Sequence, residues 1–422
     1  MLKEIETFTV NGIKVANIHN KSPIGFLGVF CSNGFIFESA SEYGVAHFAE
    51  HMFFKGTDNR TWKQINRDFA SIGSNANAYT TSDEVCYFVT TMNDKIEKSA
   101  SILMDLFFNS AYRQEEIEKE KNVITEEKKM YDDDPSSDFA NKCGKLLSID
   151  FGHDAIGSLD EIQSMTREKI VNYLNRTLGA ENMMVVFCGD MPSDKIKSIM
   201  EKLIPTHHSF IRRNKSNSKI EKLWNDDIVS SDKIKLIYER EGTEQSQVIG
   251  MFDGLSSFDT MKQEEIVLLS CLGGGDYSMM YERLREELGL CYALGVGNDI
   301  VCYPHMSVTR LFGMVEGKDV LRFIDETDKL FNRIKKDGID KELFDCAKNS
   351  VSASILRSVE TSRGKAGFLM RRVFFDNPIT IDEYIEKIQG VTIKNCNLLA
   401  EQLLNSDKVK WAAMVNDARC LR

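Results

Sequence analysis

The stretch GVAHFAEHMFFKGT, residues 44–57, places two histidines and a glutamate among alanines, phenylalanines and a methionine. On an α-helix, His47 and His51 lie one turn apart on the same face, with Glu50 beside them. Two imidazoles on adjacent turns can bind one zinc ion and leave room for a third ligand and a water. The stretch therefore predicts a metal-binding helix. The alternative is a partly buried helix that tolerates polar residues, which is the usual setting of a lone histidine.

The order His-x-x-Glu-His is also a signature of metallopeptidases. A carboxylate at Glu50 can take a proton from water and later give it to a leaving amine. Ser41 is a suitable N-cap for this helix, and Gly56 is a suitable C-terminal stop. We therefore expect the helix to run between these two residues.

A third metal ligand has candidates in the acidic segment EKEKNVITEEKKMYDDDP, residues 118–135. Helical spacing places Glu120, Ile124 and Glu127 on one face. Carboxylates that share a face with aliphatic residues are costly to bury without a cation. The other charged residues at 115–121 are typical of a solvated helix face.

Strand and helix patterns recur in the two halves of the chain. Each half reads as strands, helices, strands and long helices, which predicts an α/β (α+β) fold of two homologous domains, each a mixed sheet covered by helices. The polar segment 205–227 lacks periodicity and is typical of a linker. We predict an N-terminal domain over 1–210, a linker over 211–228 and a C-terminal domain over 229–422.

Composition narrows the classes of partner. The net charge is −11, and no basic, aromatic-interleaved stripe is present, so we expect no nucleic-acid partner. No run of about 18 apolar residues predicts a membrane span. Residues 1–20 show no signal-peptide pattern. The ten cysteines stand singly without a CxxC pair, which predicts reduced thiols and a cytoplasmic protein.

Three stretches of the first half resemble the pitrilysin family of zinc peptidases, in particular its mitochondrial-processing-peptidase-like branch of half-sized subunits. They are SNGFIFESASEYGVAHFAEHMFFKGT, GSNANAYTTSDEVCYF and EKEKNVITEEKKMYDDDP. The resemblance implies one Zn²⁺ per chain, held by His47, His51 and Glu127, the last lying 76 residues after His51. It also implies a supporting role in catalysis for Glu120. Asn77 and Ala78 lie on the strand that would run beside the peptide substrate.

In the second half, LGGGDYSMMYERLREELGLCYALGVG is similar to the family's glycine-rich segment. The resemblance implies that Arg285 and Tyr292 bind the substrate carbonyl and stabilise its developing oxyanion. A guanidinium and a phenol are both hydrogen-bond donors suited to that task. The sequence departs from the family pattern at residues 278–280, where Ser-Met-Met stands in place of Ser-Arg-Leu.

The resemblance implies a zinc-dependent endopeptidase that cleaves short or unfolded peptides, using zinc-activated water and Glu50 as general base. A half-sized chain of this family forms half of a clamshell, and two such subunits enclose a chamber. The resemblance implies a partner that is a second copy of this chain or a related subunit. Two alternatives remain open, a non-catalytic partner subunit and a metal hydrolase acting on a non-peptide bond. The intact motif and Glu127 favour the peptidase.

Overall fold

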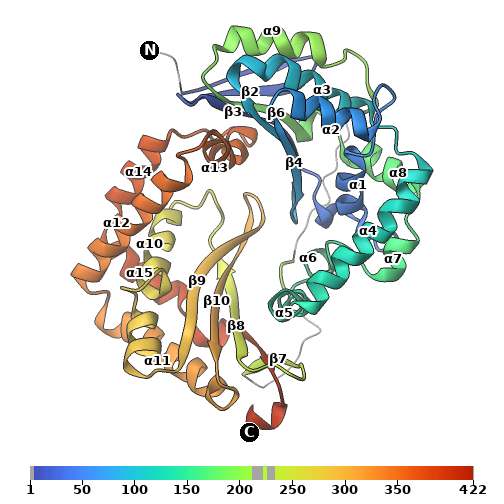
Figure 1. The fold of residues 1–422 in the computed structure, drawn as a ribbon. Helices are drawn as coiled ribbons and strands as arrows, with labels where there is room; N and C mark the ends of the chain where they lie inside the picture. Colours follow the sequence, from blue (N-terminus) through green and yellow to red (C-terminus); the bar gives the residue numbers. More distant parts are fainter. Residues whose placement is uncertain (1–3, 212–221, 226–232, 422) are drawn as a thin grey trace. The chain divides into compact units, whose positions relative to one another are not determined.

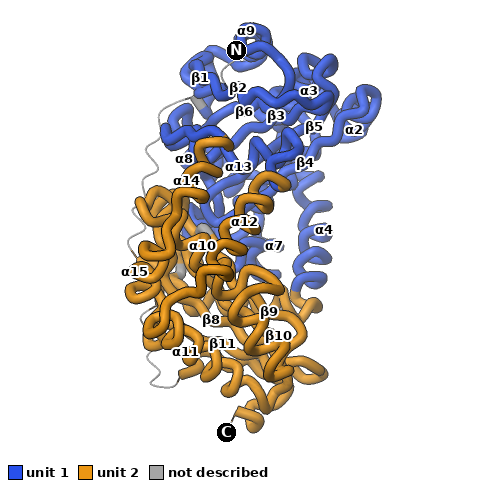
Figure 2. Tube along the Cα trace, turned by 90° about the vertical axis from the view of Figure 1, so that its left-hand side faces the viewer, with its two compact units in different colours: residues 1–131, 153–221, 358–380 blue, residues 132–152, 222–357, 381–422 orange. Residues whose placement is uncertain are grey.

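The computed structural model describes residues 4–211, 222–225 and 233–421 (Figure 1). Most of the predicted linker at 211–228 lies outside these residues. The chain forms two compact units, each assembled from three stretches (Figure 2). Unit 1 comprises residues 1–131, 153–221 and 358–380, and unit 2 comprises residues 132–152, 222–357 and 381–422. The domain boundaries predicted from the sequence stay a prediction.

Unit 1 contains a six-stranded mixed sheet in the order β1-β2-β6-β3-β5-β4. Its strands are β1 (Ile5–Val10), β2 (Ile13–His19), β3 (Ile24–Cys31), β4 (Asn75–Thr80), β5 (Val85–Met92) and β6 (Met183–Gly189). β2 and β6 are parallel, and the other neighbours are antiparallel. Asn11 and Gly12 turn β1 into β2 with φ of 48° and 90°, as a two-residue hairpin with primed-turn geometry requires.

Helices cover both faces of this sheet. Unit 1 contains α1 (Val45–Phe53), α2 (Trp62–Ser71), α3 (Ile96–Asn109), most of α4 (Gln114–Asp133), α7 (Leu159–Gln163), α8 (Arg167–Thr177), α9 (Ser193–Leu203) and α13 (Ser362–Phe374). Strand side chains alternate between faces. Leu27 and Val29 of β3 join the core built with α1 and α3. Phe30 points to the other face, where its ring lies 4.9 Å from that of Phe374 on α13.

Unit 2 contains a five-stranded mixed sheet in the order β7-β11-β8-β10-β9. Its strands are β7 (Ile234–Glu239), β8 (Ser246–Gly254), β9 (Cys291–Cys302), β10 (Met306–Val315) and β11 (Lys410–Val415). Its helices include α5 (Pro135–Cys143), α6 (Ile149–Gly152), α10 (Lys262–Gly273), α11 (Val320–Asp337), α12 (Lys341–Ser358), α14 (Ile381–Gly390) and α15 (Ile393–Leu403). A π-helix, Tyr281–Glu287, precedes β9.

The two sheets share one topology. The order β2-β6-β3-β5-β4 of unit 1 becomes the order of unit 2 when five is added to each strand number, and the parallel pair stands at the same place in both. This match confirms the predicted fold class, two homologous α/β layers with mixed sheets covered by helices. The first sheet differs by one further edge strand, β1.

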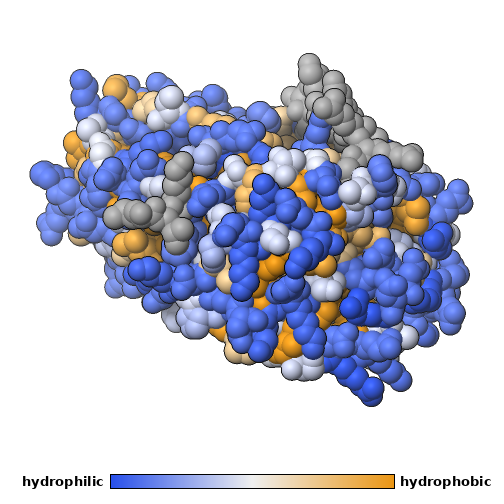
Figure 3. All heavy atoms as spheres, turned by 90° about the horizontal axis from the view of Figure 1, so that it is seen from above, coloured by the Kyte–Doolittle hydropathy of each residue, from blue (hydrophilic) through white to orange (hydrophobic). Residues whose placement is uncertain are grey.

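The described residues also show how hydrophobic groups are distributed along the helices and over the surface. Among the described parts of the chain, no helix is both long and apolar enough to cross a membrane. Hydrophilic side chains dominate the face drawn in Figure 3, and hydrophobic ones gather in smaller groups between them. The ten cysteines are all free.

Candidate active site

Helix α1 presents the His-x-x-Glu-His motif on its less buried face. Its apolar residues are buried in the core of unit 1, where they meet α8, β4 and β5. They are Val45, Ala46, Phe48, Ala49, Met52 and Phe53. Burial of this face leaves His47, Glu50 and His51 half-buried together on the other. The apolar residues thus lie on the core-facing side of the helix, and the three polar residues lie on its other side.

The N-terminus of α1 differs from the prediction. The helix begins at Val45, with Gly44 rather than Ser41 as its N-cap. Gly44 has φ of 85°, and a Cβ atom there would lie 2.4 Å from the Ile156 carbonyl oxygen, so the position favours glycine. At the other end α1 stops at Phe53, before the predicted stop at Gly56.

The Glu38 side chain satisfies the free amides at this N-terminus. Its carboxylate accepts hydrogen bonds from the backbone N–H of Gly44 at 2.8 Å and of Ala46 at 2.7 Å. His153 Nε2 lies 3.1 Å from the same carboxylate. Burial raises the pKa of Glu38, and these hydrogen bonds oppose that shift. A negative charge beside a helix N-terminus is favourable, so Glu38 fixes where α1 begins.

The structure brings the three predicted metal ligands together. His47, His51 and Glu127 each offer one ligand atom, and these atoms lie within 4.8 Å of one another. Glu127 Oε1 lies 3.8 Å from His47 Nε2, and its Oε2 lies 3.3 Å from His51 Nε2. Two imidazole nitrogens and one carboxylate form a donor set found at catalytic zinc sites. The residues therefore fit a zinc ion.

Glu120 orients one of these ligands. Its Oε1 lies 2.9 Å from His51 Nδ1, and its Oε2 lies 2.5 Å from Lys55 Nζ. A carboxylate on Nδ1 fixes the imidazole tautomer and leaves Nε2 as the metal-binding atom. Hydrogen bonds to His51 and Lys55 lower the pKa of Glu120 although its burial raises it. Glu120 thus stays ionised beside the ligands.

The surroundings of the two histidines shift their pKa values in opposite directions. Burial, together with the neighbouring His51, lowers the pKa of His47 to about 4. Burial also disfavours a charge on His51, but hydrogen bonds to Glu120 and Glu127 outweigh it and raise the pKa of His51 to about 9. The proton on His51 therefore compensates the two carboxylates where a cation would otherwise do so.

Glu50 is held by strand β4. The Thr80 hydroxyl donates a hydrogen bond of 2.5 Å to Glu50 Oε2. Burial raises the pKa of Glu50, while the bond from Thr80 lowers it. A raised pKa brings a carboxylate closer to the range in which it exchanges protons near neutral pH. Thr80 lies two residues after Ala78, and no pattern in the sequence predicted its contact with Glu50.

Asn77 and Ala78 lie on an edge of the sheet. β4 is the last strand of the unit 1 order and pairs with β5 on one side. The Asn77 side-chain oxygen accepts a hydrogen bond of 2.8 Å from the backbone N–H of Ala78. An edge strand offers backbone groups to an extended peptide.

Arg285 and Tyr292 belong to unit 2 and lie beside each other. The Arg285 guanidinium carbon is 4.8 Å from the ring centre of Tyr292 and 4.7 Å from that of Tyr281, one turn earlier in the π-helix. Tyr292 is 74% exposed. Guanidinium groups pack favourably on aromatic faces. The pair is therefore built within unit 2, with Tyr281 as a third member.

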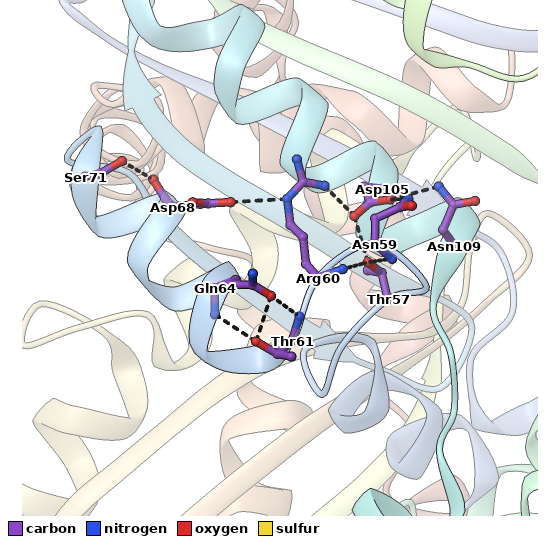
Figure 4. Close-up of polar contacts among 9 residues, drawn as sticks. All are labelled: Thr57, Asn59, Arg60, Thr61, Gln64, Asp68, Ser71, Asp105 and Asn109. Atoms are coloured by element: carbon purple, nitrogen blue, oxygen red, sulfur yellow. Dashed lines mark hydrogen bonds and ion pairs between the residues drawn. The ribbon is translucent and has the colours of Figure 1, made fainter.

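A polar network holds the loop that follows α1 (Figure 4). The buried Asp105 on α3 accepts hydrogen bonds from Thr57, Asn59, Arg60 and Asn109. The capping box of Thr61 and Gln64 then starts α2. This network borders a cavity of about 680 Å³ that contains none of the metal-ligating residues. The hydrogen bonds to Asp105 therefore fix the loop that connects α1 to α2.

Comparison with known proteins assigns the family. The model described as "Insulinase (Peptidase family M16)" matches residues 14–144, and that described as "Peptidase M16 inactive domain" matches residues 164–351. An uncharacterized zinc protease of Rickettsia felis is 31% identical over 388 residues, which cover 91% of this chain and 90% of that protein. The chain belongs to peptidase family M16, the pitrilysin family, as its motifs indicated.

Other relatives agree. The uncharacterized zinc protease YmxG of Bacillus subtilis is 25% identical over 401 residues, covering 94% of this chain and 95% of that protein. A protease from Helicobacter pylori has a similar fold, with a TM-score of 0.88 at 18% identity over 98% of this chain and 100% of that one. An M16-like peptidase from Alicyclobacillus acidocaldarius matches with a TM-score of 0.80 at 20% identity, over 98% of each chain.

Proposed function

We propose that this chain is a zinc-dependent endopeptidase that cleaves short or unfolded peptides. The observation that carries the proposal is the convergence of His47, His51 and Glu127 within 4.8 Å, with Glu50 on the same helix face as the histidines. The family and the names of the relatives support a zinc protease.

Zinc bound by His47, His51 and Glu127 would supply Lewis acidity toward a water molecule and the scissile carbonyl. Glu50 accepts the proton of the attacking water on its carboxylate and then donates it to the departing amine. Glu120 and Lys55 do not touch the peptide in this scheme. Glu120 holds the His51 ring in place, and Lys55 pairs with Glu120.

Strand β4 binds the peptide in an extended form. The peptide backbone pairs with the open edge at Asn77 and Ala78, so main-chain hydrogen bonds give affinity with little demand on sequence. An unfolded or short peptide can adopt this extended form, whereas a folded domain cannot without losing its own structure. This requirement supports short or unfolded peptides as the substrate class.

Arg285 and Tyr292 complete the proposal as donors to the substrate carbonyl and its oxyanion. Their proximity supports a joint role, since the guanidinium carbon of Arg285 lies 4.8 Å from the ring centre of Tyr292. Because they come from unit 2, their substitution is expected to lower turnover and to leave zinc binding intact. Two such chains would enclose the reaction in a chamber, as a homodimer or with a related subunit, in the cytoplasm.

The test is mass spectrometry of a pool of unstructured peptides incubated with the zinc-loaded protein. Glu50→Gln is the matched control, because it keeps the three ligands and removes the base. We expect cleavage by the wild type, a loss of about 10²- to 10⁴-fold in Glu50→Gln, and equal zinc content in both. Equal cleavage by the two proteins would contradict the role of Glu50. Zinc-loaded wild type that cleaves no peptide would contradict the peptidase.

A further inference from the structure

Strand β4 carries a second connection besides the contact with Glu50. The turn at residues 81–84 joins β4 to β5, and it is closed by Thr81 N–H to Glu84 O at 2.8 Å. Thr80, the residue before this turn, donates the 2.5 Å hydrogen bond to Glu50. The position of the Glu50 carboxylate therefore depends on where this turn lies.

Arg371 on helix α13 forms hydrogen bonds to two residues of this turn. Arg371 Nε donates to Glu84 Oε2 at 2.5 Å, and Arg371 Nη2 donates to Asp83 Oδ1 at 3.2 Å. The Tyr79 hydroxyl donates to the other oxygen of Glu84 at 2.8 Å. Glu84 is 3% exposed. Hydrogen bonds between charged groups in such a setting are strong and directional, so the turn is fixed to α13.

This contact joins two segments that lie far apart in the sequence. Arg371 lies 287 residues after Glu84, and α13 is the helix that closes the second face of the unit 1 sheet. A turn between two strands needs no such anchor to form. A buried ion pair is by itself weak evidence for a large gain in stability, so this one is better explained by the position that it gives to the turn.

We propose that Thr80 and Arg371 are positioning residues for Glu50. Thr80 orients the carboxylate directly, and Arg371 acts through Glu84 and the turn to hold Thr80. The inference rests on the proposed function, in which Glu50 is the base. It adds two residues that touch neither the metal ligands nor the peptide in that scheme.

The first experiment removes the hydroxyl. Thr80→Val is expected to lower kcat roughly 10- to 100-fold, as for loss of a hydrogen bond to a charged group, with KM and zinc content unchanged. Thr80→Ser is expected to restore kcat, because it keeps the donor. Thr90→Val on β5 is the control, since the Thr90 hydroxyl faces the Asn75 carbonyl instead. Full kcat in Thr80→Val, or an equal loss in Thr80→Ser, would overturn the role of Thr80.

The second experiment tests the path through Arg371. Arg371→Gln is expected to lower kcat roughly 3- to 10-fold with KM unchanged, while Arg372→Gln on the same helix has no effect. In the Thr80→Val background, Arg371→Gln should change kcat by less than about 2-fold, because both act on one contact. Independent, multiplying losses would overturn the path. If the single variant fails to fold, the paired Glu84→Gln/Arg371→Gln, which removes the Arg371 charge together with that of its shorter-range partner Glu84, replaces it.

A third readout does not depend on activity. Amide hydrogen exchange of residues 75–92 should speed up in Arg371→Gln and stay unchanged in Arg372→Gln, because exchange follows local opening. Unchanged exchange in Arg371→Gln would overturn the proposal whatever the activity. Faster exchange together with a wild type that cleaves no peptide would support the anchoring of the turn and refute the proposed function alone.

Discussion

The two units use one sheet topology but put different polar groups at the same place. In unit 1, α1 lies between β3 and β4 in the chain and packs on β4; in unit 2, α10 lies between β8 and β9 and packs on β9. α1 carries His47, Glu50 and His51. α10 carries Lys262 and Glu265, which are 6% and 0% exposed.

The difference lies in how the buried charges are satisfied. Lys262 Nζ donates to Glu265 Oε2 at 2.5 Å, to Asn298 Oδ1 at 2.9 Å and to the Leu255 carbonyl at 2.8 Å. All three ammonium donors of Lys262 are thus used. The ligands around α1 converge instead on a point that a cation can occupy. The same helix position thus carries a self-neutralised ion pair in unit 2 and, in the proposed function, the metal-binding residues of unit 1.

The largest expected effect on the free energy of unfolding comes from breaking the Lys262–Glu265 ion pair in unit 2. Lys262→Met leaves the Glu265 carboxylate buried without its cation, so we expect the free energy of unfolding to fall by about 3–5 kcal/mol. Urea unfolding followed by circular dichroism measures it. The paired variant Lys262→Met/Glu265→Leu removes both charges and should recover most of the loss. A single variant as stable as the wild type would show that α10 does not depend on its ion pair.

The next effect concerns the proton that stands in for a metal in unit 1. In the metal-free protein the pKa of His51 is raised to about 9, above about 6.5 in the unfolded chain. A raised pKa contributes stability that is complete below about pH 6.5 and is lost as the pH rises through about 9. We therefore expect metal-free protein to lose stability over this range, by thermal unfolding, and His51→Gln to lose less. An unchanged Tm of the metal-free wild type across the range would contradict the charge assignment.

The unit 1 side of this contrast was predictable from the sequence for local reasons, whereas the buried Lys262–Glu265 pair of unit 2 was not. The i, i+4 spacing of His47 and His51 predicted two imidazoles on one face, and the fold class followed from the repeated element order. Thr80 was missed because its contact with Glu50, 30 residues away, depends on how β4 packs against α1. Arg371 was missed because its contact also depends on tertiary packing. No periodicity in the sequence shows that α13 belongs to unit 1.

An effect of intermediate size is expected from Glu120, the carboxylate behind the metal-binding His51 of unit 1. Glu120→Gln removes the charge that orients His51 and keeps a side chain of the same shape. We expect zinc affinity to fall about 10- to 100-fold, as for loss of a carboxylate behind a metal-binding histidine. Competition with a chromophoric chelator measures it, with Glu118→Gln on the exposed side of α4 as the control. Unchanged affinity in Glu120→Gln would mean that the ring of His51 is held by packing alone.

The smallest effect tests how the two helices begin. α10 has Met261 as its N-cap with no side-chain hydrogen bond, whereas α1 receives the carboxylate of Glu38. Glu38→Gln keeps the shape and removes the charge, so we expect a loss of about 1 kcal/mol in the free energy of unfolding and little change in zinc affinity. Ser41→Ala, at the N-cap predicted from the sequence, should leave stability unchanged, because Ser41 lies outside the helix. If Ser41→Ala destabilised the protein more than Glu38→Gln, the start of α1 at Gly44 would be wrong. The reverse order would show that a carboxylate from outside the helix sets where the metal-binding motif begins.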